Sequence, residues 1–186
     1  GLAVIAGLNI SSTISNLFNV AFISMGIAVS IIVGQLLGAG KMEEAKDTDR
    51  KLIAFSVACC FVIGALLAVV SPLFPQMYNT TEEVRSLAAR FILISAVLMP
   101  VQAFTQACYF TMRSGGKTFI TFLFDSVFLW VVSIPLAFVL SRYTSLPIIP
   151  LYLACQLVDI IKCVIGFVMV KKGVWIHNFV EDERTV

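Results

Sequence analysis

The sequence predicts an all-α membrane protein, an antiparallel bundle of five transmembrane helices. Hydrophobic residues make up 59% of the 186 residues and charged residues only 13%, whereas soluble domains are about 25% charged. A soluble chain of this length has too little interior to bury so much apolar surface. The charges are also unevenly placed, since long runs such as Gly1–Gly40 contain none. A bilayer accommodates this pattern because the outer surface of the protein can then be apolar too.

The uncharged runs define the expected helices. A helix needs about 20 apolar residues to cross a hydrocarbon layer about 30 Å thick. A transmembrane barrel would instead show short segments of alternating polarity. The five spans are expected near residues 8–36, 52–74, 91–112, 118–140 and 147–170.

Short connections are expected between these spans, so neighbouring helices should run antiparallel. The first span ends at Gly38–Gly40, and the mixed charges of Lys41–Lys51 indicate an amphipathic surface turn before the second. Thr80 and Glu83 have the spacing of a capping box, which would start the third helix ahead of its apolar run.

Lysines and arginines outside the spans are concentrated on one side of the predicted bundle. Nine lie in residues 41–51, 113–117 and 171–186, and the opposite side carries three, Arg85, Arg90 and Arg142. Because an excess of Lys and Arg marks cytoplasmic loops, the first span is expected to run inward. Residues 171–186 are then a cytoplasmic tail, in a multi-pass protein of the plasma membrane.

A polar stripe runs along the first predicted helix. Asn9, Ser12, Asn16 and Asn19 follow one another at steps of three, four and three residues, which places them on one helix face. Amides facing lipid would lack hydrogen-bond partners, so this face is expected to meet protein or water. Interhelical hydrogen bonding and a hydrated cavity wall both explain it. The opposite wall of such a cavity would be Gln102 and Gln106 on the third helix, one turn apart.

Small residues form a second stripe nearer the end of the same helix. Gly26, Ser30, Gly34 and Gly38 recur at four-residue steps, a spacing that permits close contact with a neighbouring helix. This stripe is expected to be a packing seam.

Three ionisable side chains lie inside the predicted spans: Asp125 on the fourth helix, and Asp159 and Lys162 on the fifth. At 1.5 Å per residue, Asp125 is about 12 Å from Lys117 and Lys162 about 13 Å from Lys171, so an ion pair between them is expected. Two carboxylates and one ammonium leave a surplus negative charge. The group is either a static cluster that fixes helix packing or a site that couples to a cation or proton.

Other chemistries find little support in the sequence. No basic stripe with interleaved aromatics is present, so nucleic acid is not an expected partner. A membrane-embedded enzyme would need metal-ligand spacing or a Ser/His pair within the spans. The one histidine, His177, follows the last span, and the five cysteines show no CxxC spacing. Neither an enzyme nor a resident metal or cofactor is expected.

Several motifs resemble one family of transporters. The segment Val33-Gly-Gln-Leu-Leu-Gly-Ala-Gly40, followed by Ala45, resembles the VGQxLGAGxxxxA segment of multidrug and toxic compound extrusion (MATE) proteins. Arg113-Ser-Gly-Gly-Lys-Thr118 is similar to that family's Arg-x-Gly-Gly-Asp-Thr turn, with Lys117 in place of the Asp. The ending Lys171-Lys-Gly-Val-Trp175 resembles the basic-aromatic end of the family's last helix.

This resemblance implies about twelve helices in two lobes around a central cavity, and export of organic cations or drugs in exchange for Na⁺ or H⁺. The chain would be part of the C-terminal lobe, and its partners would be the first helix of that lobe, the N-terminal lobe and the lipid bilayer. The family's acid on the tenth helix has no counterpart, because residues 91–112 contain none. A lipid flippase of the same superfamily and a non-transporting membrane scaffold remain the alternatives.

Overall fold

The protein is a helical bundle that spans a membrane, as the sequence predicts. The computed structural model describes residues 1–144 and 146–176, and throughout these residues the regular secondary structure is helical. His177 and Arg184 lie outside the described residues. Five helices are long and apolar enough to cross a bilayer: α1 (Leu2–Gly38), α2 (Met42–Val70), α3 (Glu82–Ser114), the α4–α5 span (Thr118–Tyr143) and α6 (Ile148–Lys171).

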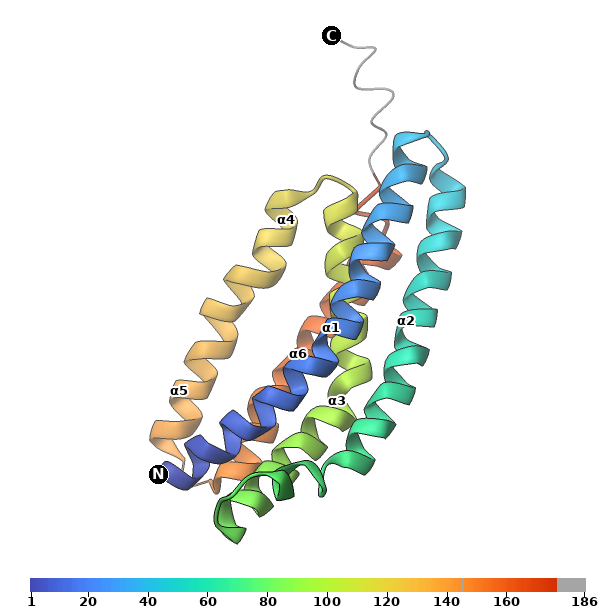
Figure 1. Ribbon diagram of the computed structural model, residues 1–186. Helices are drawn as coiled ribbons and strands as arrows, with labels where there is room; N and C mark the ends of the chain where they lie inside the picture. The colour runs from blue at the N-terminus through green and yellow to red at the C-terminus, as the bar shows by residue number, and fades with distance from the viewer. Residues whose placement is uncertain (145, 177–186) are drawn as a thin grey trace.

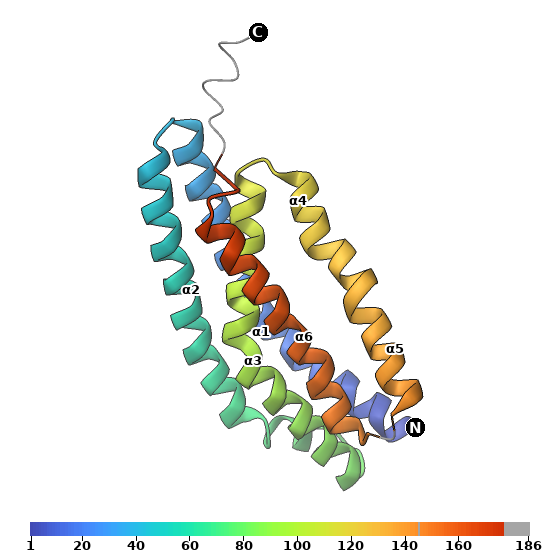
Figure 2. The ribbon, with the colours of Figure 1, turned by 180° about the vertical axis from the view of Figure 1, so that it is seen from behind.

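Successive helices run in opposite directions (Figure 1). The α1–α2 turn, the α3–α4 turn and the segment after α6 gather at one end of the bundle (Figures 1 and 2). We call this the basic end, because Lys41, Arg113, Lys171 and other cations lie there. The α2–α3 connection and the start of α6 lie at the opposite end.

Helix α3 is the centre of the bundle and packs against α1, α2 and α6. Its buried side chains include Phe91, Ile92, Met99 and Ala103. Helix α1 meets it with buried residues that recur at steps of three or four, which is the spacing of one helix face. A hydrophobic core therefore forms between α1, α2 and α3.

The α4–α5 span is built differently. It begins as α4 (Thr118–Phe122), continues through two π-helical segments, Leu123–Val127 and Leu129–Ser133, and ends as α5 (Ile134–Tyr143). It lies at the edge of the bundle (Figure 1), and α5 contacts α6. Most of its surface is exposed, so this helix is attached to the others along a narrow strip.

Two expectations about the connections were wrong in detail. Residues 41–51 do not form a surface turn, because α2 already begins at Met42 and carries these charges on its first three turns. Helix α3 does start early, at Glu82, but its cap is Thr81 and not Thr80. The Thr81 hydroxyl accepts a hydrogen bond from the Val84 amide at 3.5 Å.

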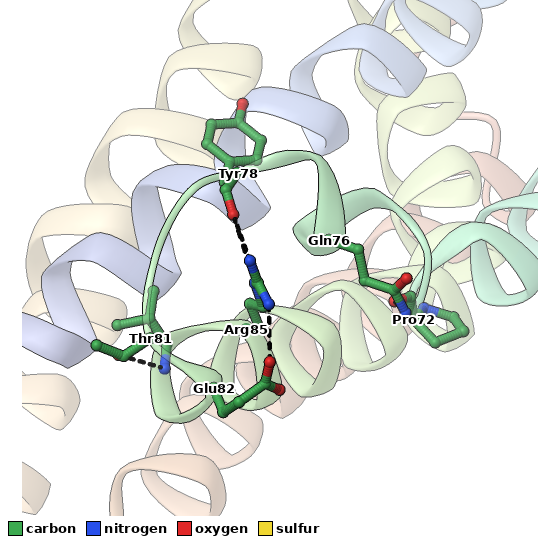
Figure 3. A network of polar contacts seen from close by, with 7 residues as sticks. Pro72, Gln76, Tyr78, Thr81, Glu82 and Arg85 are labelled. Atoms are coloured by element: carbon green, nitrogen blue, oxygen red, sulfur yellow. Dashed lines mark hydrogen bonds and ion pairs between the residues drawn. The ribbon is translucent and has the colours of Figure 1, made fainter.

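Figure 3 shows how the α2–α3 connection is held. The Arg85 guanidinium donates to the Tyr78 carbonyl at 3.1 Å and pairs with the Glu82 carboxylate at 2.7 Å. The Gln76 amide donates to the Pro72 carbonyl at 3.1 Å. Hydrogen bonds and an ion pair between residues close in sequence therefore hold this connection, which lies at the opposite end of the bundle from the basic end.

The small-residue stripe of α1 forms a close contact at only part of its length. A Cβ atom on Gly26 would lie 2.2 Å from the ring of Phe110 on α3, so any side chain at this position would displace that ring. At Gly34 the nearest atom would be 4.0 Å away, on Ser114, and Gly38 faces open space. The expected seam thus exists near Gly26 and opens toward the basic end.

The segment after α6 folds back into the basic end. Trp175 is 2% exposed and lies in a hydrophobic cluster with side chains of α1, α2, α3 and the α4–α5 span. Its indole nitrogen donates to the Val170 carbonyl at 3.3 Å. A Cβ atom on Gly115 would lie 1.8 Å from the Trp175 carbonyl oxygen, so the α3–α4 turn admits this segment only with glycine there.

Candidate functional site

A cavity of about 320 Å³ lies where α1, α3 and α6 face one another, and we call it the polar cavity. Four side chains of the α1 stripe line it: Asn9, Ser12, Asn16 and Asn19. Gln102 lines it from α3, and Tyr152 and Gln156 line it from α6. The stripe of α1 and Gln102 thus meet in one place, as residues on facing helix surfaces can.

Hydrogen bonds connect the wall of the polar cavity. The hydroxyls of Ser95 and Tyr152 lie 3.1 Å apart, which joins α3 to α6. The Gln156 amide donates to the Tyr152 hydroxyl at 3.4 Å, and the Asn19 amide donates to the Asn16 side-chain oxygen at the same distance. The tilted ring of Phe91, 4.8 Å from that of Tyr152, packs behind this wall.

A second cavity of about 300 Å³ adjoins the first, and we call it the charged cavity. Asn19 and Gln102 line both cavities. The charged cavity is also lined by Gln106, Asp159 and Lys162, which do not line the polar cavity. Together the two cavities form one polar track along the bundle, with neutral amides and hydroxyls at one end and ionisable groups at the other.

The expected ion pair is present. Lys162 Nζ on α6 lies 2.5 Å from Asp125 Oδ1 on the α4–α5 span, and 5.2 Å from the centre of the Phe124 ring. Asp125 itself lines a separate pocket on the far side of this pair. Asp159 lies one helical turn before Lys162, on the side of the charged cavity. The carboxylate in excess of the ion pair therefore faces the polar track.

The wall formed by α1 is open to the outside of the bundle. Asn9, Ser12 and Asn16 are exposed, whereas Asn19, Gln102 and Gln106 are half-buried. Amides exposed at this depth need water or a further protein surface as partners. The polar cavity is therefore open along the α1 side of the bundle.

Tyr152, Gln156 and Ser95 line the polar cavity but were not predicted from the sequence. Tyr152 and Gln156 lie four residues apart, and Asp159 follows three residues later, so all three share a face of α6. The helical spacing that predicts the stripe of α1 therefore also indicates Tyr152 and Gln156. Ser95 is a lone serine in an apolar run, and only its contact with Tyr152 identifies it.

A buried aspartate at the basic end was also missed. Asp49 on α2 is 0% exposed, and its Oδ1 accepts a hydrogen bond of 2.6 Å from the Thr111 hydroxyl on α3. Its Oδ2 is buried without a partner among the described residues. In the sequence Asp49 lies within a charged stretch that indicates a solvated surface, so only the packing of α2 on α3 reveals it.

A resident metal finds no site in the part of the chain that the structure describes. None of its His, Cys, Asp and Glu side chains gather in groups of three or more that could hold a metal ion. Asp125 and Asp159 each face Lys162, which supplies a competing positive charge.

Comparison with known proteins gives consistent matches. The family model MatE matches residues 1–139. The "Probable multidrug resistance protein YoeA" of Bacillus subtilis is 31% identical over 127 residues, which are 68% of this chain and 27% of that protein.

Animal proteins match as well. "Multidrug and toxin extrusion protein 2" of Mus musculus is 24% identical over 155 residues, or 82% of this chain and 27% of the mouse protein. "Multidrug and toxin extrusion protein 1" of Xenopus tropicalis is 27% identical over 142 residues, covering 75% and 25%. The chain thus spans about a quarter of the length of these relatives. No solved structure matches it significantly.

Proposed function

The chain belongs to the MatE family, and from this we propose that the full-length protein is a secondary antiporter. It exports organic cations or drugs in exchange for Na⁺ or H⁺ by alternating access. The printed names of the relatives, which refer to multidrug resistance and toxin extrusion, support an efflux role. This chain supplies one wall of the transport cavity and no enzymatic chemistry.

The continuous polar track is the observation that carries this proposal. Asn19 and Gln102 line both cavities, so amide side chains extend from the polar cavity beside Tyr152 to the charged cavity beside Asp159. Ionisable groups inside a membrane are costly and belong by default to substrate or ion pathways. The surplus carboxylate beside Lys162 attracts a cation, whether substrate, Na⁺ or H⁺.

We place this chain in the C-terminal lobe of a plasma-membrane transporter. The first helix of the lobe and the N-terminal lobe would cover the exposed amides of α1. The basic end would face the cytoplasm, because it carries the excess of lysines and arginines. The polar cavity then lies toward the outer side and the charged cavity toward the cytoplasm.

Cation efflux by the full-length protein in proteoliposomes tests this function. A fluorescent organic cation is loaded, and a Na⁺ or an H⁺ gradient is imposed separately. We expect one of these gradients to drive efflux. Gln102→Leu should slow it by about fivefold or more, because it removes a hydrogen-bonding group shared by both cavities. Asp159→Asn should weaken the dependence on the driving ion.

Gln76→Leu is the matched control, since Gln76 lies in the exposed α2–α3 connection and lines neither cavity. It should transport at the normal rate. An efflux rate that depends on neither gradient, or that is unchanged in Gln102→Leu and Asp159→Asn, would contradict the proposal. A protein that moves a labelled phospholipid between leaflets but no organic cation would be a flippase instead.

A further inference from the structure

A groove on the bundle surface between α2, α3 and α6 leads up to the basic end. It has a volume of about 390 Å³. Ile53 and Ala54 of α2, Phe104 of α3 and Phe167 of α6 line its apolar length. Phe167 is 53% exposed and its ring centre lies 6.4 Å from that of Phe104. This groove is on the opposite side of α3 from the contact with α1 and shares no residue with the two cavities described above.

A basic pocket of about 210 Å³ continues the groove at its end. Arg50, Val170 and Lys171 line both the groove and the pocket, so the two are contiguous. Lys46 and Lys172 complete the positive charge of the pocket. Lys171 Nζ also lies 5.8 Å from the centre of the Phe167 ring, which holds this cation where the apolar and polar parts meet.

Among the residues that the structure describes, the pocket has a net positive charge even after its acidic neighbours are counted. Lys46 pairs with Glu43 at 2.5 Å. Arg50, Lys171 and Lys172 form no ion pair with any acid in residues 1–144 and 146–176. Asp49 also lines the pocket, but its one carboxylate lowers the charge of these three cations without reversing it.

We propose that this groove and pocket bind one anionic phospholipid from the leaflet at the basic end. An acyl chain would lie along Ile53, Ala54, Phe104 and Phe167, and the phosphate would meet Arg50 and Lys171 at the rim. Basic pockets beside membrane helices attract anionic headgroups, and each Lys or Arg near the surface strengthens that attraction. An apolar channel that ends in a cluster of cations matches the two chemistries of such a lipid, and neither part alone would retain it. The bound lipid would join α2 to α6 at the end of the bundle where Trp175 is buried.

The test is a lipid-binding titration on the detergent-purified full-length protein, read by native mass spectrometry. Phosphatidylglycerol and phosphatidylcholine with identical acyl chains are compared, because they differ in headgroup charge. We expect tighter binding of phosphatidylglycerol. The double variant Arg50→Gln/Lys171→Gln should weaken this binding by about 25-fold, or about fivefold for each charge removed.

The matched control is Lys41→Gln/Lys117→Gln, which removes two charges from the same end but touches neither the groove nor the pocket. It should bind phosphatidylglycerol normally. A second variant, Ala54→Phe, places a ring in the groove at an exposed position and should also weaken lipid binding. Free glycerol 3-phosphate should not displace the lipid, because it lacks the acyl chains.

Four results would overturn the proposal. Equal affinity for phosphatidylglycerol and phosphatidylcholine would show that headgroup charge does not contribute to binding. Equal losses in the control and in Arg50→Gln/Lys171→Gln would show a general effect of net charge on the surface. Normal binding by Ala54→Phe, or displacement by glycerol 3-phosphate, would leave an anion-binding pocket without a lipid site.

Discussion

Helix α3 and the α4–α5 span have similar apolar sequences but are held in different ways. Helix α3 is packed on three sides, and Phe91, Met99 and Met112 along it are almost fully buried. The α4–α5 span keeps only Thr121 and Phe124 buried, both near the basic end. Farther along, Trp130 and Phe138 are more than half exposed.

The difference shows that hydrophobicity alone does not determine which membrane helices form a core. Lipid tails are as apolar as leucine, so close packing and polar contacts decide which helices associate. Helix α3 has aromatic and small residues that fit its neighbours, together with Ser95 and Thr111, which hydrogen-bond across helices. The α4–α5 span has one cross-helix ion pair, from Asp125 to Lys162. The following substitutions test this contrast, in order of expected effect.

The largest effect is expected for Phe91→Ala on α3. Phe91 is 0% exposed and packs against Tyr152, so its removal leaves a cavity between α3 and α6. We expect the free energy of unfolding to fall by about 3 kcal/mol. Unfolding of the full-length protein by SDS titration in mixed micelles, followed by circular dichroism, measures it. A loss below about 1 kcal/mol would contradict a central role for α3.

Thr111→Val should have the next largest effect. The substitution removes the only hydrogen bond found for the Asp49 carboxylate among the described residues and leaves that buried group without a partner. We expect a loss of about 2 kcal/mol in the same unfolding measurement. Thr121→Val is the control, because Thr121 is also buried but donates to the Lys117 carbonyl in its own helix. If both variants lose the same unfolding free energy, the hydrogen bond between Thr111 and Asp49 contributes no stability beyond that of a hydrogen bond within one helix.

The ion pair between Asp125 and Lys162 should contribute less. Asp125→Asn and Lys162→Ala should each destabilise the protein, and the double variant should be milder than the sum by about 1 kcal/mol. A double-mutant cycle of unfolding free energies gives this coupling. Strictly additive losses would mean that the α4–α5 span is held by something other than this pair.

The smallest effect is expected for Phe138→Ala on α5, the matched partner of Phe91→Ala. Phe138 is 60% exposed, so its loss creates no cavity in this bundle. The unfolding free energy should change by no more than about 0.5 kcal/mol. A loss as large as that of Phe91→Ala would show that another part of the full-length protein covers this face.

Most of the fold could be predicted from the sequence because the bilayer imposes long apolar helices. All five spans are present, although α2 and α3 begin about ten residues earlier than their apolar runs. Those extra turns carry charges, which an apolar criterion excludes but a helix outside the hydrocarbon layer tolerates. The π-helical segments of the α4–α5 span gave no sequence signal, since they depend on backbone geometry that ordinary apolar residues can adopt.

The residues of the candidate site that could be predicted from the sequence are those that repeat at helical spacing. Asn9, Asn16 and Asn19 repeat at helical spacing, so their shared helix face could be inferred. In the structure this face lines the polar cavity. The pairing of Asp125 with Lys162 followed from their equal depth in the bilayer. Asp49 could not be identified in this way, because burial of one charge within a charged stretch depends on contacts between helices and not on the local pattern.

The burial of Trp175 gives the protein an internal optical reporter. The two tryptophans of this chain lie in opposite surroundings, since Trp175 is 2% exposed and Trp130 is 69% exposed. Any movement that separates the ends of α1, α2 and α3 at the basic end must pull the indole of Trp175 out of its apolar cluster and into water. Its fluorescence emission would then shift to longer wavelength while that of Trp130 stayed constant. Fluorescence spectroscopy without an added dye would thus follow any separation of these helix ends.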